Sequence, residues 1–283
     1  MSEAVTIAGG LAFPEGPRWH QGRLWVSDQH DGSVHVMAED GRAEERFAVP
    51  GGPSGMGWLP DGDLLVVSMA ERRLYRRGPD RRLAIHAELA ALHPGHSNDM
   101  VVDRQGRAYV GNIGFDFDHG EEPRTTAMAL VSPEGAVSLA ADDLLCPNGA
   151  VITPDGRTLI IAESLAGRLT AFTLGTRGEL FDRRCFAPIE GHVPDGICLD
   201  AEGCVWAASP FAQEVIRVRE GGEIVARIRI ENGAPYACAL GGADGRSLFI
   251  CCAPDHARHV TLAARGGRID RVPVAVPAAL EMA

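Results

Sequence analysis

Short apolar runs and polar turns alternate along the whole chain, and the same arrangement recurs six times. Each copy contains an Asp-Gly, Gln-Gly or Glu-Gly turn followed by a short, mostly apolar run, such as LWVS after Gln21-Gly22 or LLVVS after Asp61-Gly62. The six turn glycines are Gly22, Gly62, Gly106, Gly156, Gly203 and Gly245, which places successive copies 40 to 50 residues apart. Such a period is typical of the blades of a β-propeller.

Each copy has the pattern of two consecutive hairpins. A β-like segment precedes each turn glycine, and a second hairpin follows, as in VHVMAEDG and VIRVREGGEIV. An isolated sheet of this kind would have two apolar faces that only neighbouring sheets can cover. The pattern therefore predicts an all-β, six-bladed β-propeller, with four-stranded antiparallel blades around a central channel, as a single domain over residues 1–283.

The alternatives and the ends of the chain add detail to this expectation. Two β-sandwiches would explain the even spacing poorly. The segments Val5–Ile7 and Val272–Val276 are both candidates for the strand that closes the ring. Because 34 glycines and 18 prolines interrupt most helical patterns, only Ala87–Leu92 is expected to form a helical turn.

Composition narrows the classes of partner. The formal net charge of −11 disfavours binding to nucleic acid or to anionic membranes. The seven cysteines include no Cys-x-x-Cys pair, so neither a disulfide framework nor a thiolate zinc site is indicated. No basic region followed by an apolar stretch begins the sequence, and we expect a cytoplasmic protein. The oligomeric state is left open.

Polar residues recur at one register of the repeat, where the strand before each turn glycine begins. These positions are Glu15, Ser54, Asn98, Asn148, Asp195 and Ala237. Equivalent positions in a radial repeat are neighbours around the axis, so we expect these side chains to form a ring near one mouth of the channel. Any one Asn-Gly or Asp-Gly alone would be an ordinary turn. Their coincidence at one register is what predicts a site.

The ring has the composition of a hard metal site. Two carboxylates in a narrow channel require either a cation or raised pKa values. Carboxylate and carboxamide oxygens, without a thiolate, suit one divalent ion, with Ca²⁺ preferred and Mg²⁺, Mn²⁺, Zn²⁺ or Fe²⁺ as alternatives. A proline before and a glycine after Glu15, Asn148 and Asp195 would hold these side chains in place.

At the same residues the chain resembles the senescence marker protein, gluconolactonase and luciferin-regenerating enzyme family. The matching segments are Pro14–Trp19, Ser97–Asp99, Pro147–Gly149 and Pro194–Gly196. The resemblance implies a six-bladed propeller that opens sugar lactones with one divalent cation. It also implies that Glu15, Asn148 and Asp195 are the metal ligands, with Asp195 also the general base, and that Asn98 reaches the metal, its water or the substrate.

The chain departs from the sugar lactonases of that family beside Asn98. Where they have Arg-x-Asn-Asp-Gly, this sequence has His96 to Met100, with an apolar residue at the end and no arginine. The segment Gly111–Phe117 brings Phe115, Asp116 and Phe117 to the same region. We therefore expect a less hydroxylated lactone, with Asn98, His96 and Asp116 contacting the substrate and Asp99 supporting the Asn98 loop.

The expected reaction is the attack of an activated water on a polarised lactone carbonyl, with Asp195 as base and no covalent intermediate. The sequence contains no Gly-x-Ser-x-Gly elbow, which disfavours a serine hydrolase. The pairs His93/His96 and His256/His259 are expected on strands or loops, where a spacing of three does not bring two imidazoles together. Two other functions remain open: a phosphotriesterase-like hydrolase on the same scaffold, and a non-enzymatic propeller that binds a peptide or protein.

Overall fold

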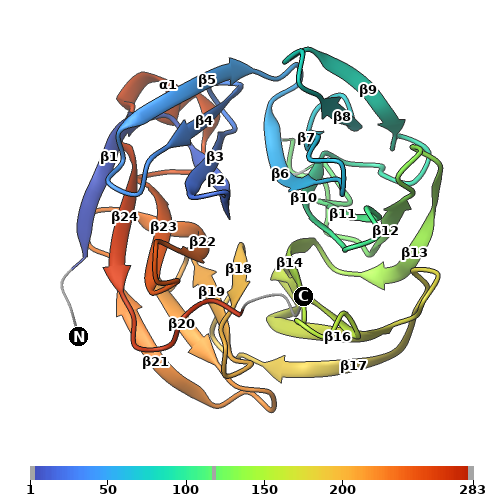
Figure 1. Cartoon of the computed structure of the whole chain (residues 1–283). Coiled ribbons are helices and arrows are strands. Elements are labelled where there is room, and N and C mark those ends of the chain that lie inside the picture. The colour runs from blue at the N-terminus through green and yellow to red at the C-terminus, as the bar shows by residue number, and fades with distance from the viewer. Residues whose placement is uncertain (1–3, 117–118, 280–283) are drawn as a thin grey trace.

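Six four-stranded antiparallel sheets form a ring (Figure 1), which confirms the predicted six-bladed propeller. The computed structural model describes residues 4–116 and 119–279.

Blade 1 contains β2 (Pro14–His20), β3 (Arg23–Asp28), β4 (Ser33–Met37) and β5 (Ala43–Ala48), and blade 2 contains β6 (Pro53–Trp58), β7 (Leu64–Ser68), β8 (Arg73–Arg77) and β9 (Leu83–Glu88). Blade 3 contains β10 (Ser97–Val102), β11 (Ala108–Asn112), β12 (Thr126–Val131) and β13 (Val137–Leu144), and blade 4 contains β14 (Pro147–Ile152), β15 (Thr158–Glu163), β16 (Arg168–Leu174) and β17 (Leu180–Pro188). Blade 5 contains β18 (Ile197–Leu199), β19 (Val205–Ser209), β20 (Glu214–Val218) and β21 (Ile224–Arg229), and blade 6 contains β22 (Ala234–Gly241), β23 (Ser247–Ala253), β24 (Gly267–Pro273) and β1 (Val5–Leu11).

The apolar core lies between the blades. Strand β7 shows why its run LLVVS is apolar throughout: Leu65 and Val67 pack with blade 3, while Leu64 and Val66 pack toward blade 1. Successive side chains of a strand point to opposite faces, and here both faces are covered by a neighbouring blade. The continuous apolar runs of the repeat are therefore the second strands of the blades, buried on both sides.

Both terminal segments contribute to the sheet that closes the ring. Val5 of β1 pairs with Arg271 of β24, so the first strand of the chain becomes the outermost strand of blade 6. Of the two candidate segments, the N-terminal one supplies this fourth strand, and the C-terminal one overlaps the third strand, which ends at Pro273. The innermost strands β2, β6, β10, β14, β18 and β22 each pack against the innermost strands of both neighbouring blades.

The helices are short and were placed wrongly from the sequence. Ala87 and Glu88 end strand β9, and the rest of Ala87–Leu92 forms a turn rather than a helix. The described helices are η1 (Ser164–Ala166), a single 3₁₀ turn, and α1 (Arg258–Ala264) between β23 and β24. No side chain caps the N-terminus of α1, which removes the usual sequence signal for a helix start. His259, expected on a strand or loop, lies on α1. None of the described helices is long and apolar enough to cross a membrane.

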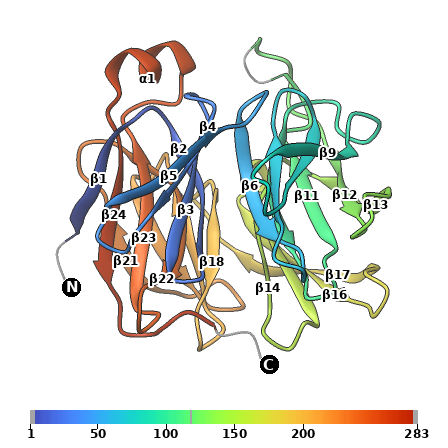
Figure 2. The ribbon, with the colours of Figure 1, turned by 45° about the horizontal axis from the view of Figure 1, so that its top comes forward.

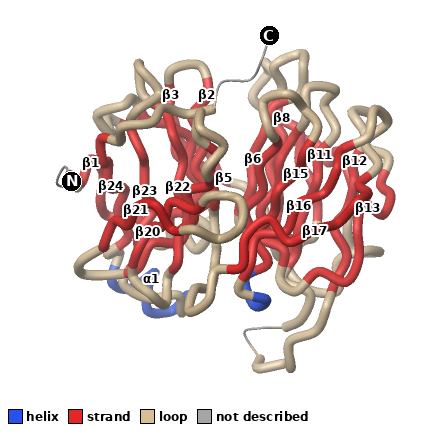
Figure 3. Tube along the Cα trace, turned by 90° about the horizontal axis from the view of Figure 1, so that it is seen from below, coloured by secondary structure: helices blue, strands red, loops and turns tan. Residues whose placement is uncertain are grey.

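The connections between the second and third strands of every blade lie at one end of the channel. Each innermost strand begins beside the end of its neighbour, as shown by the pairings Pro14–Asp28, Pro53–Ser68 and Pro147–Glu163. We call this end the mouth. Helix α1 and the β11–β12 connection both project from it (Figure 2), and the helical segments lie on this one face (Figure 3).

Candidate functional site

The six predicted ring positions occupy equivalent places at the mouth. Glu15, Ser54, Asn98 and Asn148 are each the second residue of an innermost strand, and each lies at or within a shift of the pairing register. Such irregularities turn a side chain out of the regular pleat. Asp195 lies two residues before β18, and its backbone N–H donates to the carbonyl of Ala208 in β19. Ala237, the sixth position, offers no ligand atom.

The glycine after three of these residues allows the innermost strands to approach closely. A Cβ added to Gly149 would lie 2.5 Å from the backbone nitrogen of Ile197 and 2.8 Å from the carbonyl oxygen of Asp195. A Cβ on Gly16 would lie 2.8 Å from the carbonyl oxygen of Ser54, and its φ of +50° also disfavours a side chain. The Pro-X-Gly motif thus fixes the ring through the backbone of the next blade.

Replacing Gly149 by alanine is expected to lower the free energy of unfolding by about 1–3 kcal/mol, since the added methyl overlaps the backbone of blade 5. Gly9→Ala is the matched control, because a Cβ there would meet nothing within 4 Å. Urea denaturation of both variants measures the difference. Equal free energies of unfolding for the two variants would contradict the prediction, because blades 4 and 5 would then accommodate the added methyl group without loss of stability.

Two buried carboxylates of the ring, Glu15 and Asp195, lie close enough for their charges to repel one another. Burial and repulsion by Asp195 raise the pKa of Glu15 well above its usual value, although Gly16 donates its backbone N–H to Oε2 at 2.7 Å. Burial also raises the pKa of Asp195 to about 7, against the opposing effect of a hydrogen bond from Asn148. The site therefore favours bound protons or a bound cation over two free charges.

A third carboxylate nearby, that of Asp99, is paired with an arginine that comes from another blade. The Arg18 guanidinium, from blade 1, donates to Asp99 Oδ1 at 2.6 Å and to the carbonyls of Met56 at 3.1 Å and Met100 at 2.7 Å. Asp99 also accepts the backbone N–H of Met100 at 2.8 Å. Arg18 thus joins the innermost strands of blades 1, 2 and 3. Asp99 accepts the Arg18 guanidinium directly after Asn98, and its role as a support for Asn98 stays a prediction.

The two carboxamides are oriented by hydroxyl groups. Asn148 Nδ2 donates to Ser164 Oγ at 3.2 Å, and Ser164 in turn donates to the carbonyl of Pro194 at 2.7 Å. The amide nitrogen of Asn148 thus links this ring position to η1 and, through Ser164, to the residue before Asp195. On the other side, Ser54 Oγ donates to Asn98 Oδ1 at 3.3 Å, and Asn98 is largely buried. Both carboxamides are therefore held by neighbouring hydroxyls.

The remaining predicted substrate contacts lie further out. His96 and Asp116 are exposed at the mouth, and Asp116 accepts from His119 Nδ1 at 2.9 Å. This hydrogen bond lowers the pKa of Asp116, and the charge of His96 contributes to the same shift. The two predicted residues are thus neighbours on the surface of blade 3 at the mouth.

The apolar residues expected beside the pocket lie elsewhere. Met100 is fully buried in the core between blades 2 and 3, because the side chain after Asp99 points to the opposite face of β10. Phe115 is also buried, at 3% exposure. Phe117 lies outside the described residues. Neither Met100 nor Phe115 therefore supplies the exposed apolar surface that the sequence suggested.

His93 supports the same loop from within the protein. Its Nδ1 is hydrogen bonded to Ser97 Oγ at 2.8 Å, next to Asn98, and burial lowers its pKa to about 4. Because the folded state prefers the neutral imidazole, the unfolded chain binds a proton first as the pH falls from 6.5 to 4. The contribution of His93 to the free energy of unfolding is therefore fully present above pH 6.5, and it is lost progressively as the pH falls from 6.5 to 4.

We expect this loss to amount to about 3 kcal/mol for His93, from the difference between the two pKa values. Urea denaturation at pH 7 and pH 4 measures it, with His93→Gln losing less stability than the unmodified protein across that interval. His119→Gln is the control, because its side chain is 84% exposed. A His93→Gln variant with an unchanged pH dependence would contradict the assignment.

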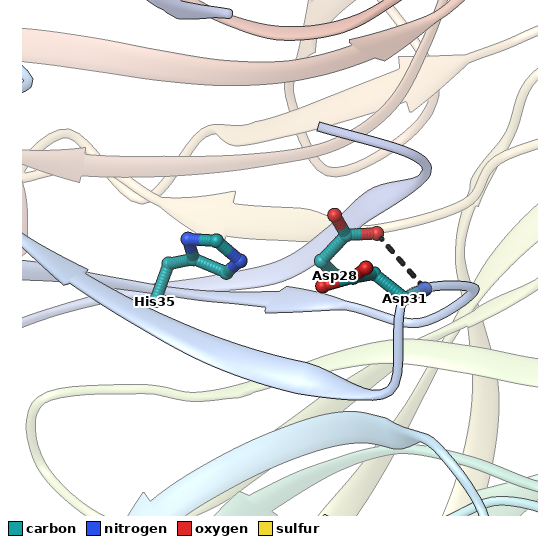
Figure 4. A group of neighbouring side chains, drawn as sticks. All are labelled: Asp28, Asp31 and His35. Carbon is teal, nitrogen blue, oxygen red and sulfur yellow. Dashed lines mark hydrogen bonds between the residues drawn. The ribbon is translucent and has the colours of Figure 1, made fainter. Parts of the chain in front are cut away.

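A second cluster of metal-type ligands, formed by Asp28, Asp31 and His35, lies on blade 1 (Figure 4). Asp28 accepts the backbone N–H groups of Ala12 and Phe13, both at 2.8 Å, and so anchors the residues just before Pro14-Glu15. Asp31 forms ion pairs with Arg46 and with Arg265 at the end of α1. These carboxylates are already bonded within the protein, and the cluster positions the first ring residue.

Sequence reasoning missed the roles of Ser164, Arg18 and Tyr236. Burial and the negative charges of Asp195, Asp255 and Glu15 raise the pKa of Tyr236. Its ring centroid lies 4.5 Å from that of Phe13. Tyr236 directly precedes Ala237, so its position next to the sixth ring residue was the available signal. Arg18 follows Glu15 by three residues, and nothing local indicated the reach of its side chain across two blades.

Comparison with known proteins matches residues 13–254 to the family described as "SMP-30/Gluconolactonase/LRE-like region". Regucalcin from Gallus gallus is 27% identical over 163 residues, which cover 56% of this chain and 54% of that protein. The 6-deoxy-6-sulfogluconolactonase of Pseudomonas putida is 28% identical over 156 residues, covering 54% and 52%. The chain thus spans about half the length of these curated relatives. A crystal structure of a calcium-binding protein, regucalcin, from Agrobacterium tumefaciens has a TM-score of 0.82 at 24% identity, covering 99% and 96% of the two chains.

Proposed function

Because this chain belongs to the SMP-30/gluconolactonase/LRE-like family, we propose that it is a metal-dependent hydrolase that opens a lactone ring. Its relatives include a 6-deoxy-6-sulfogluconolactonase, which supports the reaction class. The single observation that carries the proposal is the pair of buried, mutually repelling carboxylates, Glu15 and Asp195, at the mouth of the channel.

The charges around this pair match one divalent cation. Asp99 is neutralised by Arg18, which is also the one cation among the described residues whose charge lowers the pKa of Glu15. Among the residues that the structure describes, neither Glu15 nor Asp195 forms an ion pair with a protein cation. A group of charge +2 would balance them and remove the burial penalty that raises both pKa values.

The donor atoms also fit such an ion. Glu15, Asn148 and Asp195 would hold it through oxygen atoms, and hard divalent cations such as Ca²⁺ prefer oxygen ligands. The description of the Agrobacterium tumefaciens structure as a calcium-binding protein agrees with this choice. When bound, the cation would supply Lewis-acid polarisation of the lactone carbonyl.

The side chains of the chain itself would carry the remaining steps. Asp195 would accept a proton from the attacking water, because it is a buried carboxylate at a ring position that Asn148 and the backbone of Ala208 hold in place. Asn98, held by Ser54, would donate its amide N–H to the substrate. His96 and Asp116 would contact the part of the substrate that projects from the mouth. The lactone then opens to a hydroxy acid without a covalent intermediate.

A metal-stripped preparation reloaded with Ca²⁺, Mg²⁺, Mn²⁺ or Zn²⁺ and assayed against lactones, phosphotriesters and simple esters tests the proposal. We expect lactone hydrolysis only in the reloaded samples, together with about one bound ion per chain. Faster turnover of phosphotriesters would favour the alternative hydrolase on this scaffold. Absence of any stoichiometric ion and of all turnover would favour a binding module instead.

We further propose that the protein acts in the cytoplasm on a small-molecule lactone, without nucleic acid or membrane partners. The seven cysteines are all free thiols, and the net charge of −11 disfavours polyanionic partners. Fractionation of the cells that produce the protein checks the location.

A further inference from the structure

Exposed apolar side chains are distributed unevenly over the propeller. Among the described residues, the large hydrophobic side chains with high exposure are Val5, Ile85, Leu139, Leu165, Phe181 and Phe211. Four of them lie on outermost strands, namely β1, β9, β13 and β17. The other two, Leu165 and Phe211, lie at the mouth, on adjacent blades. Phe211 is the most exposed of the set, at 75%.

Leu165 is the central residue of η1, and this turn touches the proposed ligands directly. Ser164, the residue before it, accepts from Asn148 and donates to the carbonyl of Pro194, which precedes Asp195. The turn closes through the N–H of Gly167, which donates to the carbonyl of Ser164. The exposed Leu165 side chain, at 41%, is therefore fixed to the blade that carries Asn148.

Phe211 occupies the equivalent turn of blade 5. Ala208 accepts the backbone N–H of Asp195, and the chain turns just beyond it, with the N–H of Gln213 donating to the carbonyl of Pro210 at 3.1 Å. Pro210 is buried, which anchors the turn, whereas Phe211 at its tip is not covered by the protein. Leu165 thus lies in a turn hydrogen bonded to Asn148, and Phe211 in a turn that follows the hydrogen-bond partner of Asp195 by three residues.

The blades on either side of blades 4 and 5 have a different character at the mouth. His96 and Asp116 are exposed on blade 3, and Asp255 is charged and partly exposed on blade 6. A ligand seated on the ring would therefore meet polar groups from blades 3 and 6, and a leucine and a phenylalanine from blades 4 and 5, which lie between them. A sugar lactone carries hydroxyl groups around its ring, and hydroxyls placed against apolar side chains lose hydrogen bonds to water.

We propose that Leu165 and Phe211 bind an apolar substituent of the substrate, so that the preferred substrates are lactones that carry an alkyl or aryl group. This inference rests on the proposed lactone hydrolysis. The lactone carbonyl would lie over the ring, and the substituent would extend toward blades 4 and 5. Contact with the substituent removes apolar surface from water on both partners and so raises kcat/KM.

Five-membered lactones with no substituent, a methyl group or a hexyl chain provide the test. For the unmodified protein, the ratio of kcat/KM for the hexyl lactone to that for the unsubstituted lactone is expected to be about tenfold or more. Phe211→Ser is expected to lower this ratio about fivefold, and Leu165→Ser to lower it by a smaller factor. Phe181→Ser is the matched control, since Phe181 is 46% exposed on the outermost strand β17; its ratio should not change.

The outcomes separate the two proposals. If the unmodified protein hydrolyses no lactone, the proposed function fails. If it hydrolyses lactones with a ratio that is the same in Phe211→Ser, Leu165→Ser and Phe181→Ser, the function stands and the inference about these two side chains is overturned. An unchanged ratio combined with a shift in elution volume for Phe211→Ser would assign Phe211 to contacts between protein copies instead, and would equally overturn the inference.

Discussion

Replacing Asp195 by asparagine is expected to lower kcat/KM for lactone hydrolysis by about 10³-fold or more while leaving the fold intact. The substitution removes both a ligand charge and the proposed base, and each of these roles is worth orders of magnitude in a hydrolase. It also removes the repulsion that raises the pKa of Glu15. The metal-free variant should therefore be at least as stable as the metal-free parent.

Two measurements separate this result from simple unfolding. Thermal denaturation with and without Ca²⁺ should show a stabilisation by the ion in the unmodified protein that is absent in Asp195→Asn. Asp244→Asn is the control, because Asp244 is an exposed acid in the turn between β22 and β23, at the end of blade 6 away from the mouth. Turnover by Asp195→Asn at the level of this control would remove Asp195 from the chemistry.

Replacing Arg18 by methionine is expected to lower the free energy of unfolding by about 3–5 kcal/mol, because it leaves the Asp99 carboxylate buried without its counterion. The carbonyls of Met56 and Met100 also lose a donor. Methionine approximates the length of the arginine stem, so the lost charge and hydrogen bonds dominate the effect. Urea denaturation of the metal-free protein measures the change.

The double variant Arg18→Met/Asp99→Asn should recover part of this loss, since the unpaired charge is then removed as well. Arg73→Met provides the comparison with an ordinary surface pair: Arg73 and Glu88 are 33% and 57% exposed, and about 1 kcal/mol or less is expected there. If Arg18→Met lowered the free energy of unfolding no more than Arg73→Met, the pair of Arg18 and Asp99 would stabilise the fold no more than an exposed ion pair does.

The repeat predicted the blades because its apolar runs are buried by the same arrangement in every copy. The run LLVVS of β7 is covered on both faces, and an equivalent strand lies in each of the other blades. The ring register was visible for a related reason: Glu15, Asn148 and Asp195 follow a proline and precede a glycine that must fit against the next blade. Backbone geometry of this kind leaves a local trace in the sequence.

Contacts between side chains on different blades leave no such trace. The pairing of Arg18 with Asp99 joins residues from blades 1 and 3, and no local pattern indicates how far an arginine stem extends. Met100 was expected at the pocket, but alternation along β10 directs it into the core. Leu165 and Phe211 were also missed, because an exposed apolar residue in a turn is recognised only when the remainder of the surface is known.

The closing strand β1 has a consequence for how the chain can fold during synthesis. Val5 pairs with Arg271, so the first strand leaves the ribosome long before its partner β24 has been made. Blades 1 to 5 are each built from one continuous stretch of sequence and can form as they emerge, whereas blade 6 must wait for nearly the whole chain. Until then, the mutual burial of blades 6 and 1 is incomplete, and the nascent protein is an open arc whose two end sheets expose an apolar face.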